Sequence, residues 1–171
     1  MLASVRYSST VGQRIRGIFG MKINGYEIAA GAKLAGADLP GADLSDARLA
    51  YADLTEADLT EANLSGAALH SANLTGAKLS MANLNKADLD SVHFVRADLT
   101  KANLTSSKLV YANLKGADLT GADLTGADLT SADLDSADLS EADLTGAKLS
   151  MATLREAHLS KANLKGASLR F

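Results

Sequence analysis

The chemically active side chain that this chain carries in quantity is aspartate, and it recurs at a fixed spacing. In residues 116–144, GADLTGADLTGADLTSADLDSADLSEADL, an acidic residue precedes almost every leucine, and the leucines lie five residues apart. Evenly spaced carboxylates could hold a cation weakly, face a basic partner or keep a surface solvated. Groups for other chemistry are scarce, because the 171 residues include no cysteine and only three histidines, His70, His93 and His158. The sequence therefore offers no thiolate nucleophile, thiolate metal site or disulfide, and it lacks G-x-S-x-G, G-x-G-x-x-G and phosphate-loop motifs.

Charge divides the chain into two regions. Residues 1–30 carry four bases and one acid, whereas residues 31–171 carry 13 bases and 19 acids, within a total net charge of −3. Aromatic residues make up only 4% of the chain and tryptophan is absent, so any core must be built from small and medium aliphatic side chains. No apolar run approaches the ~18–20 residues needed to cross a bilayer, so we expect no membrane span.

The elements that must position these aspartates follow from the period. From Leu34 to Leu169 the chain contains 28 consecutive pentapeptides without a skip. The central residue is leucine in every repeat except that of Phe94, and the residue two before it is alanine except at Val92 and Ser107. The residue just before the leucine is mostly Asp or Asn, and the two after it are mostly Thr, Ser, Gly, Lys or Glu.

A period of five fits neither regular element. Five residues of α-helix advance ~500°, which would scatter the leucines around the axis, and in a strand an odd step places successive leucines on opposite faces. A chain that bends once per pentapeptide keeps Leu and Ala on one axis and turns the other three positions to water. Burying four leucines returns roughly 6–12 kcal/mol, less than the roughly 20–40 kcal/mol of backbone entropy lost in ordering about 20 residues. The turns must therefore stack, which predicts a solenoid.

The runs ADLTG, ANLSG, ADLSE and AKLSM resemble the pentapeptide-repeat family, whose pattern is A(D/N)LXX, over residues 30–171. The resemblance implies an all-β fold, a right-handed quadrilateral β-helix with four pentapeptides per square coil. Twenty-eight repeats then make about seven coils, a rod of roughly 33 Å at ~4.8 Å per coil. We accordingly expect two regions, a basic leader or cap at residues 1–29 and the β-helix at residues 30–171.

With four sides per coil, residues twenty apart stack in columns. The column that we call the acidic side carries Asp38, Asp58, Lys78, Asp98, Asp118, Asp138 and His158. Asp98, Asp118 and Asp138 should lie directly above one another, roughly 5 Å apart. The candidate acidic binding face comprises Asp38, Asp58, Glu61, Asp98, Asp118, Asp138 and Glu141. A solvated surface that merely keeps the rod soluble explains the same residues.

The other three columns are predicted to be mainly structural. The amide side carries Asp43, Asn63, Asn83, Asn103, Asp123, Asp143 and Asn163, and its asparagines predict a hydrogen-bonded ladder between coils. The alternating side carries Asp88, Lys108, Asp128 and Lys148, which predict a ladder of opposite charges worth about 0–1 kcal/mol per exposed pair. The fourth side holds the irregular repeat VHFVR at residues 92–96, either a locally swollen core around Phe94 and Val92 or a binding bump made by His93 and Arg96.

The ends of a solenoid expose core and unpaired strand edges, so they need caps. Val11, Ile15 and Ile18 recur at helical spacing after Ser9 and Thr10, which favours a short capping helix. Residues 21–28, MKINGYEI, look strand-like and should lead into the first coil. Residues 1–19 contain Arg, Ser and Thr but no acid, so an organelle-targeting or export segment is an alternative interpretation. A non-native or upstream extension before Met21 is another.

At the other end, the last coil predicts an apolar edge through which two rods could meet around a two-fold axis. The candidate dimer residues are Leu149, Leu154, Leu159, Leu164, Leu169 and Phe171.

A rod filled with Leu and Ala leaves no concave pocket, and in this geometry the three histidines fall in separate columns, too far apart to share a metal. We therefore expect a cytoplasmic, non-enzymatic protein without metal or cofactor. The favoured function is a rigid scaffold that binds a protein partner of unknown identity.

Two alternatives stay open. The resemblance extends to relatives that mimic duplex DNA and bind type II topoisomerases such as gyrase, conferring quinolone resistance. We expect no direct nucleic-acid binding by this chain. DNA of this length carries roughly 20 charges, one per ~1.7 Å, against a net −6 for residues 31–171. A purely structural module or a fragment of a secreted effector is the other alternative.

Overall fold

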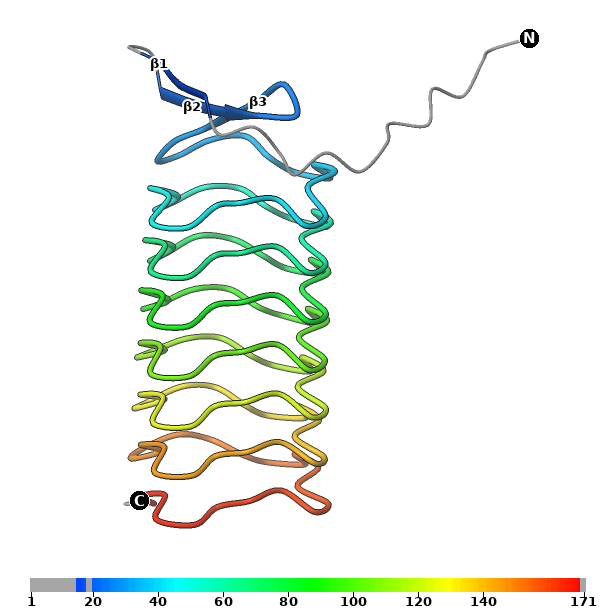
Figure 1. Cartoon of the computed structure of the whole chain (residues 1–171). Coiled ribbons are helices and arrows are strands. Elements are labelled where there is room, and N and C mark those ends of the chain that lie inside the picture. Colours follow the sequence, from blue (N-terminus) through cyan, green and yellow to red (C-terminus); the bar gives the residue numbers. More distant parts are fainter. Residues whose placement is uncertain (1–14, 18–19, 170–171) are drawn as a thin grey trace, which may run out of the picture.

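The computed structural model describes residues 15–17 and 20–169. In that part of the chain a stack of square coils is closed at one end by a small antiparallel sheet (Figure 1). The sheet contains β1 (Ile15–Gly17), β2 (Gly20–Ile23) and β3 (Tyr26–Ile28), in the order β1-β2-β3. In the described coils, the bridges between neighbouring turns are single residues and no extended strand forms. Each parallel bridge joins the residue before a core leucine to the residue twenty positions later, from Lys33–Asp53 to Lys148–Ser168. One turn therefore takes four pentapeptides.

Leucine and alanine form the core as the period predicts. From Leu39 to Leu144 the central leucines are at most 1% exposed, and the alanines two residues before them are similarly buried. Phe94 and Val92 are fully buried, so the larger side chains of the irregular repeat belong to the core, while His93 and Arg96 lie exposed on the surface. Ser107 is 1% exposed, and its hydroxyl donates to the carbonyl of Leu104 at 2.7 Å.

The repeat around Leu99 satisfies all five of its backbone N–H groups. Two N–H groups, those of Leu99 and Lys101, donate to the next coil at 2.7 and 2.9 Å. The N–H of Asp98 donates to the preceding coil at 2.9 Å, and Ala102 closes the turn on the carbonyl of Leu99 at 3.0 Å. The fifth N–H, that of Thr100, donates to the side-chain Oδ1 of Asp98 at 3.0 Å. The aspartate or asparagine of the repeat is thus part of the backbone hydrogen-bonding scheme, an Asx turn.

The corner of each repeat requires a left-handed residue two positions after the leucine. Glycine fills this position in many repeats, for example Gly121 with φ +66° and Gly126 with φ +66°. Elsewhere an ordinary residue adopts the same conformation, such as Glu61 with φ +58°. A turn closed by the N–H of the next alanine, with φ positive at its third residue, has the signature of a type II turn.

The capping sheet corrects part of the helix prediction. Ile15, one of the three apolar residues at helical spacing, lies in strand β1, which pairs with β2 in the register Arg16–Met21. Val11 and Ile18 lie outside the described residues, as do Ser9 and Thr10. The strand-like reading of residues 21–28 is confirmed by β2 and β3, which turn through Asn24 and Gly25 at φ +51° and +85°. Asn-Gly with both residues left-handed is the preferred two-residue hairpin turn, so the sequence carried this signal.

The cap satisfies the edge of the first coil. The hydroxyl of Tyr26 accepts the N–H of Asp38 at 3.3 Å, and the amide of Asn24 donates to the carbonyl of Asp38 at 3.4 Å. One coil later, the N–H and the carbonyl of Asp58 bond instead to Ala37 and Leu39 of the preceding coil. Asp38 has no preceding coil, so the cap supplies these partners. Ile23 and Ile28 are 1% and 4% exposed, so the sheet also continues the apolar core.

Candidate functional site

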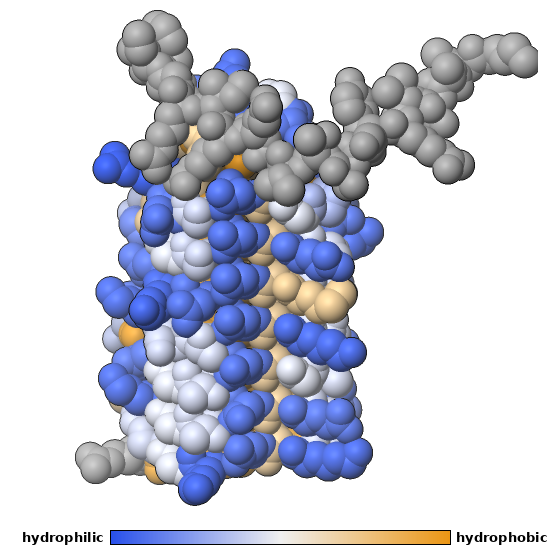
Figure 2. Space-filling view, viewed as in Figure 1, coloured by the Kyte–Doolittle hydropathy of each residue, from blue (hydrophilic) through white to orange (hydrophobic). Residues whose placement is uncertain are grey.

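The outward residues stack in four columns, because residues twenty apart are bridged. A space-filling view shows the result on one face, where a hydrophilic column runs down the rod (Figure 2). Any binding site on such a rod must be assembled from columns rather than from sequence neighbours.

On the acidic side, bridges join Asp98 to Asp118 and Asp118 to Asp138, as expected. Each of these carboxylates accepts the N–H of the residue two positions later, at 3.0, 2.9 and 2.9 Å. One oxygen of each therefore serves the turn. The aspartates consequently have a structural role that charge counting alone does not show.

Bases partly neutralise the two ends of the acidic side. Lys78 Nζ lies 4.0 Å from Asp58 Oδ2, and Lys161 Nζ lies 2.8 Å from Glu141 Oε1. His158 Nδ1 lies 3.9 Å from Asp138 Oδ2. Asp118 is bridged to an acid on both sides, Asp98 and Asp138, whereas Asp98 is also bridged to Lys78.

The same local contacts set the acidities of several carboxyl groups. The hydroxyl of Thr60 lowers the pKa of Asp58, and the hydroxyl of Ser140 lowers that of Asp138. Lys161 lowers the pKa of Glu141 through its hydrogen bond, and its own pKa is raised by the same contact. All these shifts favour the charged forms at neutral pH.

The amide side forms the predicted ladder over its first coils. Asn83 donates its side-chain amide to Asn63 Oδ1 at 3.2 Å, and Asn63 donates to Asp43 Oδ1 at 3.3 Å. Asn163 likewise donates to Asp143 at 3.2 Å. The Oδ1 atom of Asn103 accepts instead from the hydroxyl of Thr105 at 2.7 Å.

The alternating side shows the predicted ion pair at one rung. Lys148 Nζ lies 3.1 Å from Asp128 Oδ2. Asp88 contacts His70 Nδ1 at 3.4 Å, and the ring of His70 packs edge-on against Tyr51 with centroids 5.5 Å apart. Among residues 15–17 and 20–169, no ion pair within 4.0 Å is recorded for Lys108.

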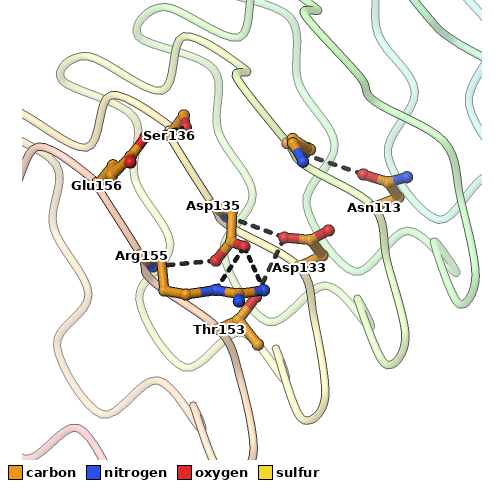
Figure 3. A network of polar contacts seen from close by, with 8 residues as sticks. Asn113, Asp133, Asp135, Ser136, Thr153, Arg155 and Glu156 are labelled. Carbon is orange, nitrogen blue, oxygen red and sulfur yellow. Dashed lines mark hydrogen bonds and ion pairs between the residues drawn. The ribbon is translucent and has the colours of Figure 1, made fainter.

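Where a repeat lacks Asp or Asn before its leucine, an aspartate of the preceding coil can take over its turn. Thr153 stands at such a position, and the N–H of Arg155 donates instead to Asp135 Oδ1 at 3.0 Å (Figure 3). Asp135, 7% exposed, also accepts from Arg155 Nε at 2.9 Å, and its Oδ2 lies 2.8 Å from a terminal nitrogen of that guanidinium. Burial raises the pKa of Asp135, but the hydrogen bonds from Arg155 outweigh this and leave it lowered. In the same way Asp90 Oδ1 accepts the N–H of Val110 at 3.0 Å, where Lys108 replaces the usual Asp or Asn.

Other chemical sites are sparse in the described residues. They contain no group of three His, Cys, Asp or Glu side chains able to hold a metal ion, and none of their helices is long and apolar enough to span a bilayer. The sequence predicted no concave pocket. An open hollow of about 470 Å³ nevertheless lies where the cap meets the first coil, lined by Glu27, Lys33 and small residues between them. It is outside the rod, whose interior is filled.

The candidate dimer residues separate into two groups. Leu149 is 1% exposed and its N–H donates to Ser168 in the coil below, so it is not on the open edge. Leu154 and Leu159 are half-buried, and Leu164 and Leu169 are 36% and 44% exposed. Phe171 lies outside the described residues.

A β-helical solenoid with twenty residues per turn and Asx turns at its corners defines the class of this protein. The family model for pentapeptide repeats matches residues 30–66, 67–105, 97–135 and 137–170, so the chain belongs to the pentapeptide-repeat family. Membership implies the right-handed β-helix expected from the sequence.

Solved structures of similar proteins include two from cyanobacteria. The chain is 39% identical to the pentapeptide-repeat protein Rfr23 from Cyanothece 51142, over 57% of this chain and 63% of that one, with a TM-score of 0.34. It is 35% identical to HetL from Nostoc sp. strain PCC 7120, a protein involved in heterocyst differentiation regulation, over 81% of each chain with a TM-score of 0.30. QnrB1, a plasmid-mediated fluoroquinolone resistance protein, matches at 21% identity over 77% of each chain with a TM-score of 0.48. The match thus spans less than two thirds of Rfr23, and no curated protein matches the chain.

Proposed function

We propose that the chain is a non-enzymatic rod of about seven coils, spanning residues 30–171 behind a capping region at 1–29, that binds a protein partner through its sides. The observation that carries this proposal is that different positions of each repeat form the core, the turn and the exposed surface. Leu and Ala fill the interior, the turn uses one oxygen of the aspartate, and most corner residues are exposed. Such a rod presents fixed charges at regular intervals but nowhere to enclose a substrate.

The acidic side around Asp98, Asp118 and Asp138 is the favoured docking surface. Its test uses a substitution that removes charge without breaking the fold, since asparagine accepts the same backbone N–H as aspartate. The triple variant D98N/D118N/D138N should lose a partner that the parent retains in affinity capture from the source cell. The matched control is D43N/D123N/D143N, which removes three charges from the amide side. Equal retention by the parent and both variants would remove the acidic side from the proposal.

The DNA-mimic alternative meets a difficulty in the order of charges along the axis. Residues 118–143 contain eight acids and no Lys or Arg, whereas residues 78–115 contain six Lys or Arg and three acids. Because a turn takes twenty residues, these blocks encircle the rod as bands of opposite sign. Duplex DNA is negative throughout its length. A gyrase supercoiling assay with micromolar protein tests this alternative, and inhibition or protection from quinolones would revive it.

An end-to-end homodimer through Leu154, Leu159, Leu164 and Leu169 stays a proposal. Light scattering at high micromolar concentration should then give twice the monomer mass, and Leu164→Asp should return it to the monomer value. A purely structural module would bind nothing in the capture experiment.

A further inference from the structure

The alternating side has a symmetry that the other three sides lack. Its charges read Asp88, Lys108, Asp128, Lys148 down the rod, and bridges place them in one column. Reversing this order gives Lys, Asp, Lys, Asp, so the column is complementary to itself when turned end for end. The acidic side has mainly like charges, the amide side has no bases, and the fourth side has no comparable alternation.

These charges are accessible to a second molecule. Lys108 is exposed and, within the described chain, has no recorded ion pair. The side chains of Lys148 and Asp128 are 63% and 28% exposed although they contact each other. Asp88 is 38% exposed beside His70.

An apolar corner borders this side. It consists of Tyr51, Tyr111 and Met151, separated in the stack by Ser71, Ser91 and Ser131. The three large residues are 67%, 68% and 69% exposed, and all hold φ near +60°. Bulky residues rarely adopt this left-handed conformation, which glycine adopts readily at other corners of this rod. Corners throughout the rod share this conformation, so it is the grouping that marks this corner: three of the four exposed Tyr and Met side chains of the described chain lie on it, the fourth being Met81.

We infer that the alternating side and the apolar corner form a self-association surface, on which two copies of this chain pack side by side and antiparallel. The two-fold axis passes midway between Lys108 and Asp128. It places Lys108 opposite Asp128 of the second copy and Asp88 opposite Lys148 of the second copy. At the same levels on the corner, Tyr111 meets Ser131 and Met151 meets Ser91 of the second copy, so each large side chain faces a small one.

The geometry selects this arrangement over its alternatives. A parallel two-fold pair would place like charges opposite each other, and a parallel pair shifted by one coil would not close and would extend into a filament. Exposed ion pairs contribute about 0–1 kcal/mol each, and a contact of about four coils is smaller than a standard interface of about 1,600 Å². The association is therefore weak and sensitive to salt, unlike an end-to-end contact made of leucines.

Sedimentation velocity of the full chain tests the surface, in a concentration series at low and high salt. We expect dimers at low salt that dissociate at high salt. Lys108→Asp should weaken association roughly tenfold or more by placing Asp opposite Asp twice. This variant should fold normally, because Asp is the usual residue at this position and Asp90 already serves the N–H of Val110. Lys101→Asp, an equal charge change outside the side, should leave association unchanged, and Tyr111→Ser should weaken it.

Mixing provides the decisive arm. Asp128→Lys alone places Lys opposite Lys and should also be monomeric, but equal amounts of K108D and D128K chains are fully complementary and should form heterodimers. Thermal melts confirm that each variant is folded, since D128K loses the turn contact to Thr130. A parent that is monomeric at low salt, or a mixture that fails to associate, overturns the inference. A dimer that resists K108D but is lost in Leu164→Asp identifies the end-to-end contact instead.

Discussion

The amide side and the alternating side lie next to each other on the rod but use the residue before the leucine differently. On the amide side all seven positions are Asp or Asn, and each accepts the N–H two residues later, at 2.8–3.2 Å. On the alternating side only Asp88 and Asp128 do so, at 3.5 and 3.2 Å. The first side uses these side chains in its turns, whereas the second places Lys108 and Lys148 at the surface, where Lys148 pairs with Asp128.

This difference separates residues that specify the rod from residues that could specify an interaction. Asp90 shows how the alternating side remains stable, since it supplies from the coil above the acceptor that Lys108 cannot. The Asp135–Arg155 pair does the same on the fourth side. At Lys108 and Thr153, departures from the repeat pattern are thus compensated by an aspartate of the preceding coil.

The largest effect that we expect from the aspartates that accept hydrogen bonds in the turns is unfolding in acid. The hydroxyl of Thr145 lowers the pKa of Asp143, and Thr55 and Thr60 lower the pKa values of Asp53 and Asp58 in the same way. Because these folded pKa values lie below the unfolded ones, near 3.9, the unfolded state binds more protons in acid. Stability is therefore complete above about pH 5 and is lost as pH falls through the depressed folded values. Thermal melts from pH 8 to pH 2 should show a constant midpoint followed by a steep fall.

Asp143→Asn sharpens that experiment. Asparagine keeps the acceptor for Thr145 but does not titrate, so the variant should lose less stability than the parent between pH 5 and pH 2. A melting temperature that rises on acidification would contradict the assignment of these aspartates to the turns.

The second prediction compares one residue from each side. Asn83 accepts the N–H of Asn85 and donates to Asn63, both at 3.2 Å. Asn83→Ala should therefore lower the free energy of unfolding by about 2 kcal/mol, measured by urea denaturation. Lys108→Ala on the alternating side should change it by less than about 0.5 kcal/mol. Equal losses would mean that the two sides do not differ as described.

The third prediction concerns compensation. Asp90→Ala should cost about 1 kcal/mol by orphaning the N–H of Val110, and Asp90→Asn should cost less because it keeps the acceptor. In a Lys108→Asp background the cost should shrink, since Asp at 108 can form its own turn. A double-mutant cycle measures this coupling, and strict additivity would show that Asp90 does not substitute for the missing turn residue.

Much of this structure could be predicted from the sequence because the period places each residue relative to the core. The buried leucines and alanines, the stacked columns and the amide ladder follow from that period once a turn is known to take twenty residues. The number twenty came from the family resemblance, because a period of five is compatible with other turn lengths.

Other features needed signals that were overlooked or that the sequence order hides. Asp followed by Leu and then Thr or Ser is a local Asx-turn signal, although the regular spacing of these aspartates also indicates a charged surface. Asn24-Gly25 predicts a hairpin turn, shortly after the residues from Val11 to Ile18 whose spacing favours a helix. Asp90 and Asp135 accept the N–H groups of turns one coil away, so their role cannot be seen from their own repeats. Leu149 is likewise covered by the coil that contains Ser168, and it therefore does not lie at the open end.

The smallest effect tests whether the alternating side can be converted to the amide type. Ala68 occupies the turn position in a repeat where, in the described chain, no acceptor is recorded for the N–H of His70. Ala68→Asn should supply that acceptor and raise the free energy of unfolding by about 0.5–1 kcal/mol. Ala68→Gln, whose amide is one methylene too long to close the turn, is the matched control and should bring no gain. If both substitutions behave alike in urea denaturation, the benefit of Asp and Asn on the amide side lies in their contacts between coils rather than in the turn.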